Sequence, residues 1–382
     1  MKPVRQRLVF FISGFDPKGA SSFYQEHKAS CAEHSAHHGG GYQFSRRTKQ
    51  HPWSHAWTLQ SEHADGTVTT QFEYLAWDDL VRAQWARTTG AVVRQAWDCL
   101  KDFVSTGTIK RMYTMSKSVV RAALFPYVLV AGTATAVLLL SAGAAALAAA
   151  AGLAKSAVAA IACGVLLISG WAAFKWLQSV PSTWFLRVVS FARNYANASQ
   201  VDHPMQLRIR DWSQHLQTQL KNNDPDEILL VGYSAGSILS MALIARLVRD
   251  TPQVTHKITM VTLGNCIPAT AGLPNAEHVR ADLRTLGLAN TRWVDISSPI
   301  DWGSFALNDT VWAIAGGSAC GQRLCVSPQW HLLFSPSSYQ QLKKDKYRVH
   351  KQYLQTTEIL GTYDYFAITC GPLSIHQRFF AS

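Results

Sequence analysis

The sequence predicts an α/β fold with a mostly parallel sheet, flanking helices and an inserted helical hairpin. Residues 205–297 alternate between helical and strand-like segments, the pattern of βαβ units with right-handed crossovers. Residues 4–12 form a strand pattern that runs into a glycine-bearing turn, as the first core strand of such a sheet does. A long apolar stretch separates these parts. We therefore divide the chain into residues 1–121, 122–178 and 179–382.

The remaining elements follow from hydrophobic periodicity and turn residues. An Ala-Asp-Gly turn at 64–66 predicts a hairpin of two strands. Residues 27–55, rich in His, Gly and Ser, are expected to form an irregular loop, and residues 78–121 a helical approach to the apolar stretch. The expected strands are 55–61, 67–75, 226–232, 256–263 and 291–297, and the expected later helices are 205–220, 235–249 and 276–287.

The apolar stretch predicts a membrane hairpin. No charged residue occurs from 122 to 154, and after Lys155 none occurs from 156 to 174. A spanning helix needs about 20 apolar residues, so two spans fit, near 124–147 and 156–177. The alternative is a helical hairpin buried in a soluble core, but uncharged runs of this length are rare there.

Charge and cysteine content indicate location and exclude one class of partner. The net charge is +12 with only 16% charged residues, and no recognised nucleic-acid motif accompanies the basic residues. Instead, lysines and arginines flank the apolar stretch on both sides, so the positive-inside rule predicts cytoplasmic termini and folded parts at a bacterial inner membrane. The seven cysteines have no regular spacing and fit a reducing compartment. The flanking basic residues include Lys101, Lys110, Arg111, Lys117, Arg121, Lys175, Arg187 and Arg193.

The strongest motif is the sequence Gly-Tyr-Ser-Ala-Gly at 232–236. An apolar strand precedes it and an apolar helix follows it, which is the setting that a G-x-S-x-G nucleophile turn requires. The two glycines are needed because the strand-to-helix turn is too tight for side chains. The turn exposes the Ser234 hydroxyl and directs the helix N-terminus toward developing negative charge. Ser234 is therefore the predicted nucleophile.

These residues resemble the α/β-hydrolase superfamily, and within it the lipases and esterases, with class 3 lipases as a distant comparison. The resemblance covers about 4–75 and 205–380 and leaves out the apolar stretch. It implies an oxyanion hole made by the amide that follows the nucleophile and an amide after an early strand. Here those positions are Ala235 and Phe15. No cofactor is implied.

The resemblance also implies the order nucleophile, acid, histidine along the chain. Asp301 lies just past the strand expected at 291–297, on the loop where the acid of such enzymes is carried, and is the first choice. Asp295 lies within that strand, where its side chain can point into a packed face. Asp309 is further along and is the third candidate.

Three histidines follow the predicted acid. His350 begins an H-x-x-Y sequence near the C-terminus that resembles the histidine region of class 3 lipases, so it is the predicted base. Residues 339–355 can be read as one helix, whereas such a histidine usually sits on a loop. His331, after the strand-like segment 323–327, is therefore a rival, and His376 is the third candidate.

The sequence thus predicts a membrane-anchored serine hydrolase that cleaves an ester or thioester, with a lipid or acyl ester as substrate at the bilayer. A catalytically inactive hydrolase fold that serves as a membrane scaffold is the alternative. A transporter component is disfavoured because the spans carry no intramembrane ionisable residue apart from the lysine in their connecting turn. A metal site is a further candidate, but its residue spacing matches no recognised zinc site, and a solvated loop is favoured. Its residues are Cys31, His34, His37 and His38.

Overall fold

The computed structural model describes residues 2–180, 183–316 and 321–381. Their strands form one mixed sheet in the order β2-β4-β5-β1-β6-β7-β8-β9, with β3 paired to β4. The six strands from β5 to β9 in this order are parallel, and β2, β3 and β4 add an antiparallel edge. The strands are β1 Gln6–Ile12, β2 Tyr42–Phe44, β3 Thr48–His51, β4 Ser54–His63, β5 Gly66–Leu75, β6 Glu227–Tyr233, β7 Ile258–Leu263, β8 Arg292–Ile296 and β9 Gln322–Val326.

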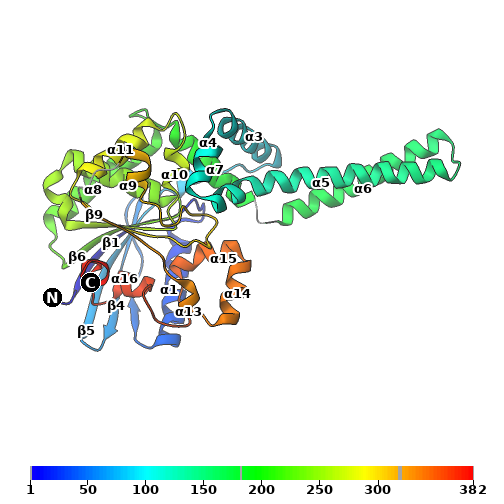
Figure 1. Ribbon diagram of the computed structural model, residues 1–382. Coiled ribbons are helices and arrows are strands. Elements are labelled where there is room, and N and C mark those ends of the chain that lie inside the picture. Colours follow the sequence, from blue (N-terminus) through cyan, green and yellow to red (C-terminus); the bar gives the residue numbers. More distant parts are fainter. Residues whose placement is uncertain (1, 181–182, 317–320, 382) are drawn as a thin grey trace.

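Helices cover both faces of the sheet (Figure 1). Strand β1 shows the two faces best, because Phe10 packs into one core while its neighbour Phe11 packs into the other. The helices of the first core are α2 Asp78–Gln84, α3 Thr89–Ser105, α4 Thr108–Met115, α7 Thr183–Ala196, α8 Pro204–Asn222, α9 Gly236–Asp250, α10 Ile267–Ala271, α11 Glu277–Leu288 and α12 Thr310–Ala315. Those of the second are α1 Gly19–His38, α13 Trp330–Leu333, α14 Pro336–Lys344, α15 Lys346–Lys351, α16 Tyr365–Cys370 and α17 Ile375–Phe379.

The predicted strands and the predicted later helices are confirmed to within a few residues, but the loop expected at 27–55 is wrong. Residues 19–38 form α1, and β2 and β3 follow it. The buried positions of α1 include His27, Cys31 and His34, which have helical spacing. Because two of these three are histidines, the inward face of α1 carries little apolar periodicity. The helix was therefore not recognisable from hydrophobic patterning.

The apolar stretch forms two long helices, α5 (Lys117–Ala150) and α6 (Lys155–Ser179). They lie side by side and extend away from the sheet (Figure 1). Both are long and apolar enough to cross a membrane by length and composition. Within the most apolar 18-residue segment of each helix, only 6% (α5) and 0% (α6) is buried. The hairpin is therefore not buried in the core of the folded domain. Exposed apolar side chains include Val128, Leu138, Leu139, Leu140, Leu147, Leu167 and Ile168.

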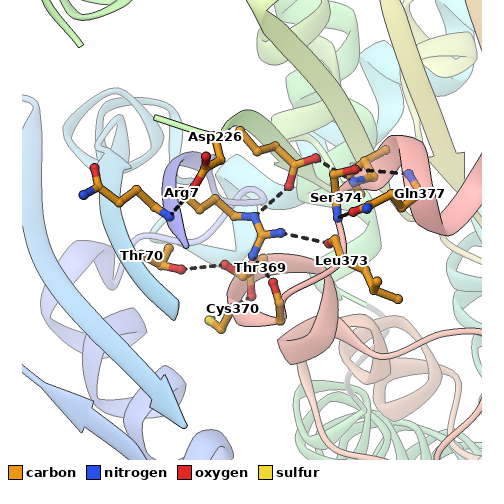
Figure 2. Close-up of polar contacts among 12 residues, drawn as sticks. Arg7, Thr70, Asp226, Thr369, Cys370, Leu373, Ser374 and Gln377 are labelled. Atoms are coloured by element: carbon orange, nitrogen blue, oxygen red, sulfur yellow. Dashed lines mark hydrogen bonds and ion pairs between the residues drawn. The ribbon is translucent and has the colours of Figure 1, made fainter. Parts of the chain in front are cut away.

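The C-terminal segment is fastened to the sheet by a buried arginine (Figure 2). Arg7 of β1 donates to the Glu227 carboxylate at 2.7 Å and to the carbonyl oxygens of Gly371 and Leu373 at 2.8 and 3.0 Å. Arg7 is 1% exposed, so these charge-assisted bonds replace its hydration. They hold the chain that joins α16 to α17 against β1 and β6.

Candidate active site

Ser234 occupies the sharp turn between β6 and α9. Its φ is 54°, in the left-handed region that few residues other than glycine adopt. The Ser234 amide donates to the carbonyl oxygen of Leu263 at 2.8 Å, which ties the turn to the neighbouring strand β7. Strain of this kind is retained where surrounding contacts enforce it, and it clusters at functional sites.

The two glycines of the motif are required by close packing. A Cβ atom on Gly232 would meet the Ser240 hydroxyl and lie 2.9 Å from the carbonyl oxygen of Gly236. A Cβ atom on Gly236 would meet the backbone of β1, 2.6 Å from the carbonyl oxygen of Ser13. Both contacts are too short for any side chain, so only glycine lets α9 approach β6 and β1 this closely.

Ser234, His350 and Asp301 form one hydrogen-bonded chain. The Ser234 Oγ lies 2.8 Å from His350 Nε2, and His350 Nδ1 lies 2.9 Å from Asp301 Oδ2. With its proton on Nδ1, the imidazole donates to Asp301 and accepts from Ser234. The structure therefore brings together the three first-choice residues of the sequence analysis; their catalytic roles stay a prediction.

The acid of this chain is shielded from water but remains an anion. Asp301 is fully buried, and burial alone would raise its pKa. His350 and a 2.8 Å hydrogen bond from the Gly303 amide outweigh that effect, so the pKa of Asp301 stays below its usual value. A buried carboxylate on Nδ1 stabilises positive charge on the imidazole, as the base of a proton-transfer site requires.

Two tyrosines hold the histidine and the acid, and neither was predicted as a site residue. The Tyr233 hydroxyl donates to the carbonyl oxygen of His350 at 2.9 Å, and their rings lie 5.3 Å apart. The Tyr353 hydroxyl accepts from the amide of Ser298 at 2.8 Å, at the start of the loop that carries Asp301. Tyr353 is the tyrosine of the H-x-x-Y sequence, so that motif was a usable signal; Tyr233 stands at a variable position of its motif and gave none.

The predicted oxyanion amides flank Ser234. Ala235 follows it at the start of α9, and a Cβ atom on Gly14 would lie 3.1 Å from the Cβ of Ser234, so the loop before Phe15 lies against the serine. The Phe15 ring is buried among aromatic rings, including Trp85 at 5.7 Å. Neither the Ala235 nor the Phe15 amide donates to another described residue.

The rival site residues lie in other environments. His331 is exposed on α13, where its ring neighbour is Tyr339 at 6.2 Å. Asp295 points between β7 and β8 and accepts from the hydroxyls of Thr262 and Ser297. Asp309 caps the N-terminus of α12. His376 lies in α17.

His350 is helical but is not inside one long helix. The chain breaks at Asp345, whose side chain caps the short helix α15 by accepting from the Arg348 amide at 2.9 Å. His350 lies in the last turn of α15, and the single helix considered at 339–355 is therefore wrong.

The histidine-rich segment forms no metal site among the described residues. His34 Nε2 bonds to the Asp364 carboxylate at 2.9 Å and its Nδ1 to the Tyr42 hydroxyl at 3.1 Å, while His38 bonds to the carbonyl oxygen of Thr357. Cys31 is buried. The solvated loop favoured for these residues is wrong, because all four lie in α1, and His34 and His38 bond to the C-terminal part of the chain; only His37 is exposed among them.

A cleft of ≈ 480 Å³ opens beside Ser234, bounded by the β1 loop, α1 and α15. Aromatic side chains line much of it, including Phe23, Tyr74 and Tyr233, and charged side chains such as Lys18 and Lys351 also line it. Ser234 and His350 both line the cleft. A small molecule in this cleft would therefore touch the serine hydroxyl directly.

A second, apolar pocket lies at the base of the α5–α6 hairpin. Side chains of α3, α4, α5 and α7 line it, together with Ile238 of α9. It also reaches Gly303, where an added Cβ would lie 2.8 Å from His350 Nδ1. The pocket thus extends from the root of the two apolar helices to the rear of the Asp301–His350 pair.

Comparisons with models of known protein families, with curated proteins and with solved structures found no match for this chain.

Proposed function

We propose that the protein is a serine hydrolase of the α/β-hydrolase type, anchored in the bacterial inner membrane by α5 and α6, that cleaves a carboxylic ester or thioester. The observation that carries this proposal is the hydrogen-bonded chain from Ser234 through His350 to Asp301. Its support is that all three side chains are at least 96% buried and come from separate parts of the sequence. A packing role alone does not require a strained serine that faces an open cleft.

In the proposed reaction, Ser234 attacks the substrate carbonyl while His350 Nε2 takes the hydroxyl proton. The tetrahedral oxyanion accepts hydrogen bonds from the Ala235 and Phe15 amides. Asp301 holds the imidazole with Nδ1 protonated and stabilises the imidazolium, which then protonates the leaving alkoxide or thiolate. Water, activated by the same imidazole, releases the acid from the acyl-enzyme. No cofactor takes part in these steps.

The apolar surfaces favour a lipid or acyl-chain substrate. The exposed side chains of α5 and α6 match a bilayer, and the apolar pocket begins where these helices meet the folded domain. The lining side chains of that pocket are almost all apolar, so a hydrocarbon group that enters it is shielded from water. Basic residues at both ends of the hairpin favour cytoplasmic termini and a cytoplasmic site.

Pre-steady-state hydrolysis of p-nitrophenyl esters by the detergent-solubilised protein tests this function. An acyl-enzyme predicts a burst of p-nitrophenol close to one equivalent of enzyme, followed by slower turnover. The Ser234→Ala variant should show neither phase. A folded wild type that hydrolyses no ester or thioester would instead favour the inactive scaffold.

A further inference from the structure

The inner end of the cleft holds two buried polar side chains without hydrogen-bond partners. His27 of α1 and Tyr365 of α16 both line the cleft and are 3% and 1% exposed. Both ring nitrogens of His27 lack a hydrogen-bond partner among the described residues, and so does the hydroxyl of Tyr365. Their rings lie 5.9 Å apart, so the two unpaired groups belong to one place.

The surroundings of His27 are aromatic. Phe72 lies 4.9 Å from its ring, Phe23 5.7 Å and Trp57 6.0 Å. Burial in this apolar box lowers the pKa of His27 to about 3, so the imidazole is neutral at physiological pH. A neutral imidazole has one donor and one acceptor nitrogen, and a tyrosine hydroxyl can do either.

Buried polar groups are nearly always paired, and an unpaired one is costly. Other tyrosines near the site obey this rule: the Tyr74 hydroxyl pairs with Ser13 at 2.7 Å, and the Tyr363 hydroxyl donates to the carbonyl oxygen of Tyr353. Other buried polar atoms of the described residues, such as the indole nitrogens of Trp57 and Trp212, also lack a partner. Of the described residues with such atoms, however, only His27 and Tyr365 line the cleft that contains Ser234.

We propose that His27 and Tyr365 form a specificity subsite that binds an uncharged hydrogen-bonding group of the substrate. The group is a hydroxyl, carbonyl or amide, carried on one arm of the ester beyond an apolar segment. The aromatic walls bind that segment, while a charged group would lose its hydration in the box without gaining an opposite charge. This inference rests on the proposed function and narrows its substrate class.

The test compares p-nitrophenyl esters of plain acyl chains with esters of the same chains that end in a hydroxyl group, over a graded series of lengths. A matching series varies the alcohol arm. Wild type should prefer the hydroxylated ester at one length of one arm, by about tenfold or more in kcat/KM, because a buried polar subsite rejects a ligand that leaves it unpaired. Tyr365→Phe and His27→Phe should abolish that preference, because they lower kcat/KM for the hydroxylated ester much more than for the plain ester.

Tyr363→Phe is the matched control, because it removes a buried hydroxyl that already has a partner; the preference should survive in it. Thermal unfolding of each variant separates misfolding from loss of the subsite, and the isosteric Tyr365→Phe keeps the test valid if His27→Phe does not fold. Equal effects of Tyr365→Phe on plain and hydroxylated esters, or no preference in wild type at any length, would overturn the subsite. Failure of wild type to hydrolyse either series would overturn the proposed function instead.

Discussion

The hydroxyl of Tyr233 donates to the backbone carbonyl oxygen of His350 at 2.9 Å, across 117 residues of sequence. Tyr233, next to the proposed nucleophile, thus holds the backbone of the proposed base. Because His350 lies in the last turn of a short helix, this bond helps set the height of its imidazole above Ser234. The hydrogen bond therefore links the backbone of His350 to the end of β6 that precedes Ser234.

Replacement of Tyr233 by Phe should weaken catalysis more than binding. The variant removes one part-buried hydrogen bond to the His350 carbonyl oxygen, which costs about 0.5–1.5 kcal/mol of stability. A small displacement of His350 should lower kcat about ten- to hundredfold with little change in KM. Steady-state hydrolysis and thermal unfolding measure both effects. A loss confined to KM would show that Tyr233 contacts substrate and does not position the base.

A methyl group on Gly303 should break the Asp301–His350 pair. The added Cβ would lie 2.8 Å from His350 Nδ1 and 3.2 Å from Asp301 Oδ1. Gly303→Ala should therefore lower kcat by at least about a hundredfold, since loss of the correct imidazole orientation is severe in such sites. Gly90→Ala is the control, because no atom lies within 4 Å of its added Cβ. Similar activity in both variants would refute the arrangement.

The buried carboxyl of Asp295 should make stability depend on pH. Burial raises its pKa to about 7, although hydrogen bonds from Thr262 and Ser297 oppose the rise. Between its ordinary value of 3.8 and about 7, the folded state binds more protons than the unfolded state, so stability falls as pH rises. The slope reaches at most about 1.4 kcal/mol per pH unit.

Asp295→Asn removes this titration. Relative to wild type, the variant should therefore gain unfolding temperature as the pH rises from 3.8 to about 7. Thermal unfolding across that range measures the difference, with the exposed Asp65→Asn as a control for a solvated carboxyl. A difference between Asp295→Asn and wild type that does not change with pH would contradict burial of an uncharged carboxyl.

The proposed membrane topology predicts which sites an impermeant maleimide can reach. In a background without the native cysteines, Lys155→Cys in the turn between α5 and α6 should react in right-side-out membrane vesicles. His331→Cys, an exposed position of the folded domain, should react only after the vesicles are lysed. The reverse pattern would place the catalytic domain outside, and reaction of both positions in intact vesicles would exclude a sealed span.

The sequence predicted the sheet and the hairpin because each follows from a local pattern. Strand β6, the turn at Ser234 and helix α9 lie within one continuous segment, 227–250, and α5 and α6 lie within another, 117–179. Helix α1 was missed because its buried face includes His27 and His34, which pack against Tyr365 of α16 and its capping residue Asp364, more than 300 residues away. Such long-range compensation leaves no trace in hydrophobic periodicity.

The site residues likewise divide into those with a local sequence signal and those that depend on long-range contacts. Ser234 was recognisable from its own motif, and Asp301 and His350 were ranked by chain order and resemblance. The cap of α15 at Asp345 was a readable signal, since an aspartate commonly begins a helix, but it was overlooked. The roles of Tyr233 and Gly303 were not readable, because each depends on a contact with His350 that only the folded chain makes.

Labelling by a fluorophosphonate probe tests the central claim most directly, because the probe forms a covalent bond only with an activated serine. The detergent-solubilised wild type should be labelled at Ser234, as located by mass spectrometry of its peptides. Ser234→Ala should abolish labelling, and His350→Ala should reduce it at least about a hundredfold, whereas the exposed His331→Ala should label like wild type. Absence of labelling in a folded wild type, or equal labelling of His350→Ala and wild type, would contradict the proposed hydrolase.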